Sequence, residues 1–164
     1  MRHAVLVAAA LLAAPVALAA VSSADRSFLQ HESQGASYEL ALAQLAAQKA
    51  TRDDVKSYAQ EVIADHDQAN AALTQLAQSK GVSLPTGMSS DDQTRLAGLK
   101  NLQGQDFDRS FVREAVRVNA EDKRDFSKEA KATHDPEIRA YVKQFSAMDR
   151  KHAAGAKQLQ RPAS

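Results

Sequence analysis

Apolar residues recur with a period of about 3.6 almost everywhere from Ser23 to the end of the chain, which is the pattern of amphipathic α-helices. No stretch shows the strict alternation of a half-buried strand. The pattern predicts four long helices and a short one between the second and third of them. The predicted long helices cover about 24–50, 53–80, 106–133 and 135–159, and the short helix covers about 89–103.

Helix-ending residues lie at several of these boundaries. Gly81 follows the second helix and suits a left-handed C-terminal cap. Asp135 and Pro136 suit the N-cap and first turn of the last helix. Gly104 is expected to end the short helix.

A weak internal repeat marks two tight turns. The segment KATRDDVKSYA at 49–59 resembles KATHDPEIRAYV at 131–142, and each lies where two long helices meet. The sequence therefore predicts an all-α bundle of four helices, built from two helical hairpins that pack their apolar faces together. The short helix lies in the connection between the hairpins, which can run the length of the bundle as a crossover. The alternative is an up-down-up-down bundle with a decorated loop.

Polar residues interrupt the apolar stripes at the middle of the long helices. His66 occupies a stripe position where a leucine is expected, between Val62 and Ala69. Asp149-x-x-His152 has the i, i+3 spacing by which one helix offers two ligands to one ion.

The other two long helices carry polar residues at a comparable depth. Glu39 borders the stripe of the first helix, and Asn119 and Asp122 point inward from the third, with Glu121 bordering the same face. Glu39 lies 12 residues before Thr51 and Glu121 lies 12 before Thr133, so each is about 18 Å from its turn.

Acids and imidazoles that converge from four helices can share protons or coordinate a cation, because isolated buried charges are costly. The predicted metal ligands are Glu39, His66, Asp122, Asp149 and His152. Histidine with carboxylate suits iron, manganese or zinc and resembles the ligand sets of di-metal bundles, although the second helix has no Glu-x-x-His pair. The alternative is that His66 lies partly exposed at a stripe edge and Asp149 pairs with Arg150 or Lys151.

The first residues, MRHAVLVAAALLAAPVALAA, are typical of a signal peptide cleaved after Ala19. We therefore expect a single helical-bundle domain over 20–164, periplasmic or secreted, without a transmembrane segment after cleavage; the alternative is an uncleaved N-terminal anchor. The chain has 21 Lys and Arg against 20 Asp and Glu, so loss of Arg2 leaves a net charge near zero. Without a basic stripe, nucleic-acid binding is not expected. The chain has no cysteine, which excludes disulfides and thiolate metal sites.

The segment YELALAQLAAQKATRDDVKSYAQEVIADHDQANAALTQLAQSKGVSLP resembles the first hairpin of bacterial exported proteins grouped as domain of unknown function 4142. The pattern matches at Glu39, Lys49, Val55, Tyr58, Asp65, His66 and Asn70. FDRSF and DPEIRAY are similar to segments of the second half. The resemblance implies a ferritin-like fold and export, and brings no agreed reaction. Family members often carry a histidine in the third long helix where this chain has Asn119, which weakens an inherited metal site.

Two functional hypotheses follow. The first is a small non-enzymatic envelope protein, with a role in stress as one option, that binds an ion or a protein partner. The second is a ferritin-like metalloprotein, an oxidase or a metal-storage protein, that uses the inward carboxylates and histidines. The sequence also leaves room for a homodimer formed through an apolar face.

Overall fold

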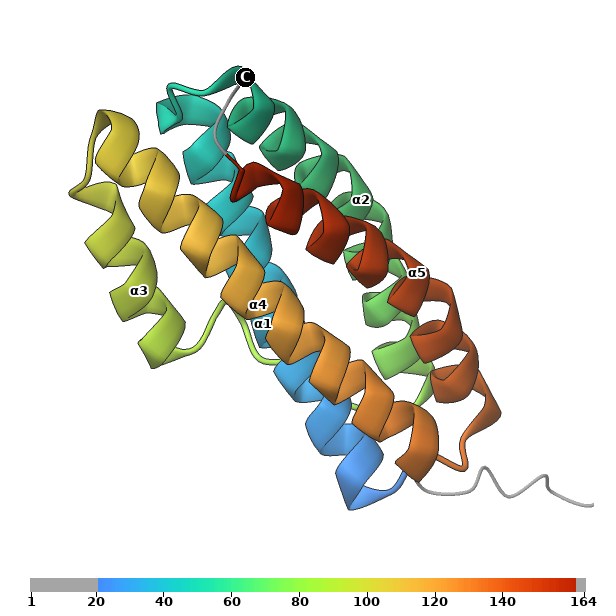
Figure 1. The fold of residues 1–164 in the computed structure, drawn as a ribbon. Coiled ribbons are helices and arrows are strands. Elements are labelled where there is room, and N and C mark those ends of the chain that lie inside the picture. Colours follow the sequence, from blue (N-terminus) through green and yellow to red (C-terminus); the bar gives the residue numbers. More distant parts are fainter. Residues whose placement is uncertain (1–20, 162–164) are drawn as a thin grey trace, which may run out of the picture.

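The computed structural model describes residues 21–161, which form five α-helices and no strand. The all-helical prediction is therefore confirmed, and the predicted signal peptide lies outside the described residues. Within this part of the chain, no helix combines the length and the apolar character that crossing a membrane requires. The helices are α1 (Ser23–Lys49), α2 (Asp53–Ser79), α3 (Ser90–Lys100), α4 (Gly104–Ala132) and α5 (Pro136–Leu159) (Figure 1).

The predicted helix caps at Gly81 and Asp135 are confirmed. Gly81 has a φ of 63°, and the Val82 amide donates to the Ala77 carbonyl at 2.9 Å, which closes α2 as a Schellman motif. The Asp135 carboxylate accepts hydrogen bonds from two amides in the first turn of α5.

The predicted role of Gly104 is wrong. The short helix α3 ends at Lys100, and Gly104 is instead the first residue of α4, with a φ of 55°. The chain turns sharply at this point because the Leu102 amide donates back to the Leu99 carbonyl and Gln103 is extended. The third long helix therefore begins two residues earlier than expected.

The four long helices form two antiparallel hairpins, α1/α2 and α4/α5, that pack against each other through α1 on α4 and α2 on α5 (Figure 1). Helix α3 packs on α1 and α4. The connection that contains α3 therefore runs along the outside of the bundle, from the end of α2 to the opposite end, where α4 begins.

Each hairpin turn is held by an aspartate from the other hairpin. The buried Asp108 of α4 accepts hydrogen bonds from the amides of Thr51 at 3.0 Å and Arg52 at 3.1 Å, and from the Thr51 hydroxyl. Asp25 of α1 makes the corresponding contact with Thr133 at the other end. The sequence repeat at the two turns thus corresponds to a structural one.

The apolar interior consists of two clusters. The first lies at the end of the bundle that holds the α1/α2 turn and includes Phe107 and Phe111. The second lies at the opposite end and includes Ile138 and Phe145. Between them, each long helix passes through a stretch that contributes few apolar side chains to either cluster, and this stretch contains the polar layer described next.

Candidate metal centre

The polar layer is the set of ionisable side chains that face one another at mid-height of the bundle. Two of its members lie at the same distance from the aspartates that contact the hairpin turns: Glu39 lies 14 residues after Asp25 on α1, and Asp122 lies 14 after Asp108 on α4. Corresponding positions of the two hairpins therefore meet at the same height. The members of the polar layer are Glu32, Glu39, His66, Asp122, Asp149 and His152.

Three of the five predicted ligands converge on one point. Glu39, His66 and His152 each offer a ligand atom, and these atoms lie within 4.8 Å of one another. His66 Nε2 is 3.4 Å from Glu39 Oε2, and the two imidazole rings stack with centroids 5.7 Å apart. Both histidines are buried, at 4% and 2% exposure. The prediction that His66 faces the interior is confirmed, and the exposed alternative is wrong.

The spacing of these three side chains suits a metal ion. Ligand atoms bound to one ion at about 2.1 Å lie up to about 4 Å apart, so small side-chain rotations would close the observed spacing. Among the described residues, neither ring nitrogen of His66 has a hydrogen-bond partner, although both are buried. Buried polar atoms are normally paired, so these two nitrogens are the feature of the layer that most needs an explanation.

The other two predicted ligands, Asp122 and Asp149, lie beside this trio and are not part of the converging set. Asp122 shares a hydrogen bond with Glu39. Asp149 is half-buried, and its Oδ2 has no hydrogen-bond partner. The alternative, a surface ion pair of Asp149 with Arg150 or Lys151, is not found among the described residues, where Lys151 pairs with Glu61 and Asp65 instead.

Hydrogen bonding determines which ring nitrogen of His152 has a lone pair that could bind a metal ion. His152 Nε2 lies 2.9 Å from Asp65 Oδ2. Burial opposes the charge on Asp65, but hydrogen bonds from His152 and Lys151 lower the pKa of this carboxyl, so it is ionised and can only accept. The proton of His152 is therefore on Nε2, and Nδ1 keeps its lone pair. A metal-binding imidazole usually donates the proton of its other ring nitrogen to a carboxylate or a carbonyl, as His152 does to Asp65.

Burial disfavours the charged forms of the carboxyls and histidines in the polar layer. Burial and the negative charge of Asp149 raise the pKa of Glu39 to about 8, against a hydrogen bond from Asp122. Burial also raises the pKa of Asp149 to about 6, against the nearby His66 and Arg150, and burial with the Glu39 charge raises that of Asp122. The pKa of each histidine is lowered by burial. The layer thus holds protons that an incoming cation could displace.

Two members of this region are not among the predicted ligands. Glu32 lies seven residues before Glu39 on α1 and accepts a hydrogen bond from the Tyr141 hydroxyl at 3.0 Å. Burial raises the pKa of Glu32, and the negative charges of Asp122, Asp149 and Glu39 raise it further. Asp65 stands directly beside His66 in the sequence and orients His152. The sequence signal for Glu32 is its spacing of seven residues from Glu39.

The remaining polar candidates have other roles. Glu121 pairs with Arg117 on the outside of α4, so the equivalent of Glu39 is Asp122. The Asn119 side-chain amide donates to the Tyr58 hydroxyl at 3.1 Å and to the Ala115 carbonyl at 2.7 Å. His134 is exposed, as expected for a turn residue.

Comparisons with known proteins agree with the sequence resemblance. The family described as "Domain of unknown function (DUF4142)" matches residues 10–159. The chain belongs to the DUF4142 family. No curated protein matches it in sequence.

Solved structures with the same helical fold are more distant in sequence. A DUF305 fragment from Deinococcus radiodurans aligns with a TM-score of 0.76 at 18% identity, over 86% of this chain and 98% of the fragment. CopM in its Cu(I)-bound form aligns with a TM-score of 0.68 at 22% identity, over 83% and 92%. CopM co-crystallised with Ag aligns with a TM-score of 0.65 at 23% identity, over 83% and 92%. At these identities the likeness establishes the fold of the DUF4142 chain and not its ligands.

Proposed function

We propose that this DUF4142 protein binds one divalent transition-metal ion in its polar layer. Glu39, His66 and His152 are the first ligands, and Asp122 and Asp149 are neighbouring carboxylates that can complete the coordination. The observation that carries the proposal is the buried, unpartnered His66 ring, held within 4.8 Å of ligand atoms from two other helices.

The ligand set favours iron, manganese or zinc. It consists of nitrogen and oxygen donors, which suit these ions, whereas Cu(I) and Ag(I) favour thiolate and thioether sulfur. CopM binds copper and silver in solved structures, which supports metal handling as a use of this fold. The DUF4142 chain has no cysteine and three methionines, so we expect its ion to differ. Cu(II), which binds imidazole strongly, is the competitor to test.

In our proposal the function of the protein is to bind a metal ion rather than to catalyse a reaction. The layer lies between two apolar clusters, and its histidines are buried, so the arrangement suits holding an ion more than turning over a substrate. The second candidate is a ferritin-like metalloprotein, an oxidase or a storage protein. It is favoured by the surplus of acids, since Glu32, Asp122 and Asp149 lie near the first three ligands and could hold a second ion. The antiparallel hairpins with a long crossover support the ferritin-like arrangement.

Export is also part of the proposal. The residues that suggest a signal peptide are Met1–Ala19, and the resemblance to exported proteins supports the same location. Cell fractionation with N-terminal sequencing of the mature protein tests this. A periplasmic protein that begins at Ala20 is the expected result, and a cytoplasmic protein that retains residues 1–19 would contradict it.

The experiment for metal binding is calorimetric titration of tag-free, metal-stripped protein with Zn²⁺, Mn²⁺, Fe²⁺ and Cu²⁺ in turn. We expect one ion bound by the wild-type protein, and loss of that binding in His66→Ala and in His152→Ala. His134→Ala is the matched control, because His134 is exposed in a turn, and it should bind like the wild type. Equal binding by His66→Ala and the wild type would contradict the proposal.

A further inference from the structure

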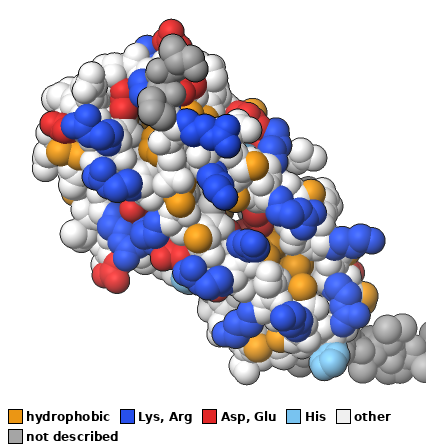
Figure 2. Space-filling model, in the orientation of Figure 1, with side chains coloured by type: hydrophobic (Ala, Val, Ile, Leu, Met, Phe, Trp, Pro, Cys, Tyr) orange, Lys and Arg blue, Asp and Glu red, His pale blue; other side chains and the backbone are white. Residues whose placement is uncertain are grey.

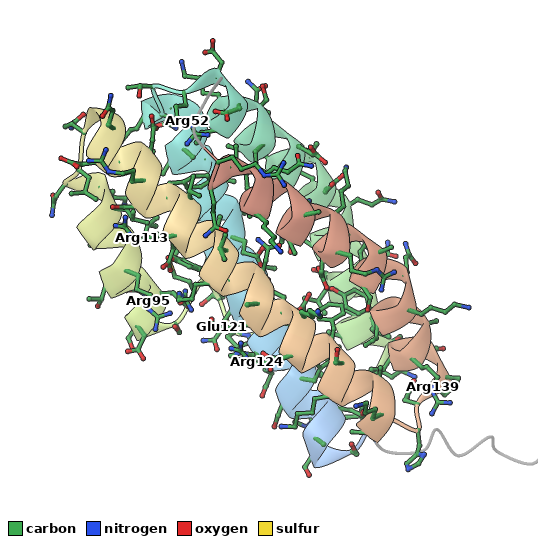
Figure 3. The ribbon with its side chains drawn as sticks, viewed as in Figure 1. Arg52, Arg95, Arg113, Glu121, Arg124 and Arg139 are labelled. Atoms are coloured by element: carbon green, nitrogen blue, oxygen red, sulfur yellow. The ribbon has the colours of Figure 1, made fainter. Side chains whose placement is uncertain are left out.

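A groove on one side of the bundle leads toward the polar layer. It lies where α1, α3 and α4 meet and has a volume of about 370 Å³. Figure 3 shows Arg95 on its α3 side and Glu121 and Arg124 on its α4 side. Gly35 and Tyr38 of α1 form part of its wall, and Asp122 of α4 also lines it.

Asp122 connects this groove to the proposed metal centre. Its side chain lines the groove on one side and shares a hydrogen bond with Glu39 on the other. Glu39 in turn faces His66 at 3.4 Å. A cation that reaches Asp122 therefore has only one carboxylate between it and the two histidines.

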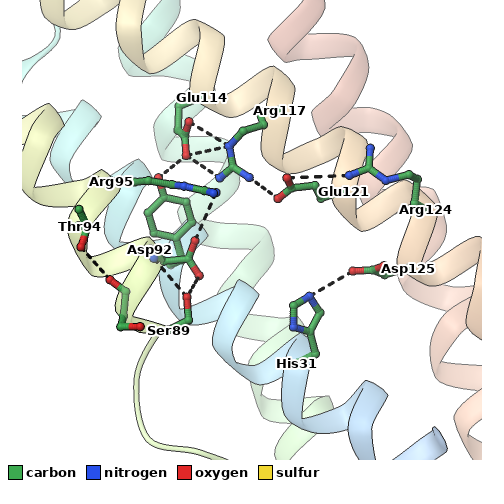
Figure 4. Close-up of polar contacts among 12 residues, drawn as sticks. His31, Ser89, Asp92, Thr94, Arg95, Glu114, Arg117, Glu121, Arg124 and Asp125 are labelled. Atoms are coloured by element: carbon green, nitrogen blue, oxygen red, sulfur yellow. Dashed lines mark hydrogen bonds and ion pairs between the residues drawn. The ribbon is translucent and has the colours of Figure 1, made fainter.

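The rim of the groove favours cations. Five acidic residues line it against three arginines. The arginines pair with acids such as Glu114 and Glu121 (Figure 4), which leaves Asp91 and Asp122 without an arginine partner among the described residues. At the outer edge, Asp125 pairs with the exposed His31 at 3.2 Å. An excess of one charge around a cleft raises the local concentration of oppositely charged ions.

A second groove approaches the layer from the face between α4 and α5, and its rim has the opposite character. Asp149 is its one acidic residue, whereas Lys123 and Arg150 also line it. Figure 2 shows Lys and Arg side chains spread over this face. Like charge at this mouth opposes the approach of a cation, although the groove is of similar volume, about 440 Å³.

Gly35 is the second observation that points to the first groove. It lies inside α1, where glycine destabilises a helix relative to alanine. No packing constraint explains it, since a Cβ at this position would meet no atom within 4 Å. The absence of a side chain at Gly35 leaves open space in the wall of the groove that Asp122 also lines.

We propose that cations reach the Glu39–His66–His152 centre through the groove between α1, α3 and α4, which Gly35 keeps open. The proposal rests on the proposed metal-binding function and adds the route by which the ion enters and leaves. A side chain at position 35 that fills the groove should obstruct this route without touching the three ligands.

The test is the rate of Zn²⁺ uptake by metal-free protein and of Zn²⁺ release to excess chelator, measured by stopped flow. Tyrosine fluorescence is a suitable signal because the Tyr58 and His152 rings are 6.4 Å apart. In Gly35→Leu we expect uptake and release to slow together by about tenfold, with an unchanged Kd, as for an obstruction on the path. Gly98→Leu is the matched control: Gly98 lies in α3 with the same open surroundings and does not line the groove, so both rates should stay at wild-type values.

A second variant tests the charge of the rim independently of its shape. Asp91→Asn combined with Asp125→Asn should slow uptake about threefold or more at low ionic strength, and by less at high salt. Lys123→Gln combined with Arg150→Gln, at the other groove, should not slow uptake. Unchanged rates in Gly35→Leu, with normal Zn²⁺ binding, would overturn the route and leave the metal centre standing. A wild-type protein that takes up no Zn²⁺ would overturn both proposals.

Discussion

The apolar clusters and the polar layer between them are built from the same four helices, yet they have opposite energetic characters. In the clusters, side chains such as Phe107, Val55 and Ile138 are fully buried against other apolar groups. In the layer, both ring nitrogens of His66 and one carboxylate oxygen of Asp149 have no hydrogen-bond partner among the described residues. Burial of apolar surface stabilises the fold, whereas unpaired buried polar atoms destabilise it.

This difference indicates that the apolar clusters stabilise the fold and that the polar layer lowers its stability. A bundle with leucine at position 66 would be easier to stabilise, since replacement of buried polar groups by apolar ones is often neutral or favourable. The DUF4142 chain instead brings acids and imidazoles from all four long helices to the middle of the bundle. A bound cation would provide the partner that the layer lacks.

The largest expected effect is in the first apolar cluster. Phe107 is 0% exposed and stacks on Phe111 with centroids 6.3 Å apart, so Phe107→Ala should lower the free energy of unfolding by about 3–5 kcal/mol. His66→Leu, at an equally buried position of the polar layer, should leave the metal-free protein as stable as the wild type or more so. Urea denaturation measures both, and a similar large loss in the two variants would break the comparison.

The next effect is the pH dependence that Glu39 gives to the stability of the metal-free protein. Because the pKa of Glu39 is raised to about 8 in the fold, the folded protein holds a proton that the unfolded chain releases near pH 4.5. The contribution of Glu39 to the stability of the metal-free protein is therefore greatest below that pH and falls as pH rises toward 8. Glu39→Gln removes this loss and should stabilise the metal-free protein by about 2–4 kcal/mol at pH 8.

At pH 4 the Glu39→Gln variant and the wild type should unfold with similar free energies. The exposed Glu61, changed to Gln, controls for the loss of a negative charge. Thermal unfolding at pH 4 and pH 8 measures the difference, and a Glu39→Gln variant less stable than the wild type at pH 8 would show that the Glu39 charge is stabilised by a partner.

Two helical glycines give a smaller contrast. A Cβ at Gly155 would lie 2.9 Å from Tyr58 Cδ2, and the Tyr58 ring packs against Phe111, so Gly155→Ala should destabilise the protein by about 1–3 kcal/mol. Gly35→Ala meets no atom and should stabilise it by about 0.5–1 kcal/mol. Denaturant midpoints distinguish the two. Destabilisation by Gly35→Ala would mean that this glycine has a packing role.

The last effect concerns metal affinity and the Asp65 carboxylate that contacts His152. Asp65→Asn removes the charge that fixes the proton on His152 Nε2 and should weaken Zn²⁺ binding about tenfold. Asp67→Asn, an exposed position on the same helix, is the control for loss of a nearby charge without contact. Calorimetric affinities that fall equally in the two variants would show that Asp65 acts only through its charge.

Much of the fold follows from local rules in the sequence. The 3.6 period fixes the helices, and Gly81 and Asp135 fix two of their ends through backbone hydrogen bonds. The mistake at Gly104 has a physical cause: a left-handed glycine can precede a helix as well as follow one, and only the packing of the Leu99–Leu102 turn decides between them.

The candidate site was partly predictable for a related reason. Periodicity placed His66 on the buried face, and the i, i+3 spacing placed Asp149 beside His152. Periodicity could not show that Asp65 faces α5. The residue next to a buried one faces either solvent or a neighbouring helix, and the packing of the helices decides which. Glu32 was missed on the same grounds, since its burial depends on Tyr141 of another helix.

The most direct test of the metal centre is anomalous X-ray diffraction from crystals of the metal-loaded protein, recorded at the zinc absorption edge. Our account predicts one strong peak within the bundle, about 2.0–2.2 Å from a ligand atom of each of Glu39, His66 and His152. Peaks confined to the protein surface, with the His66 ring still unpartnered, would contradict it.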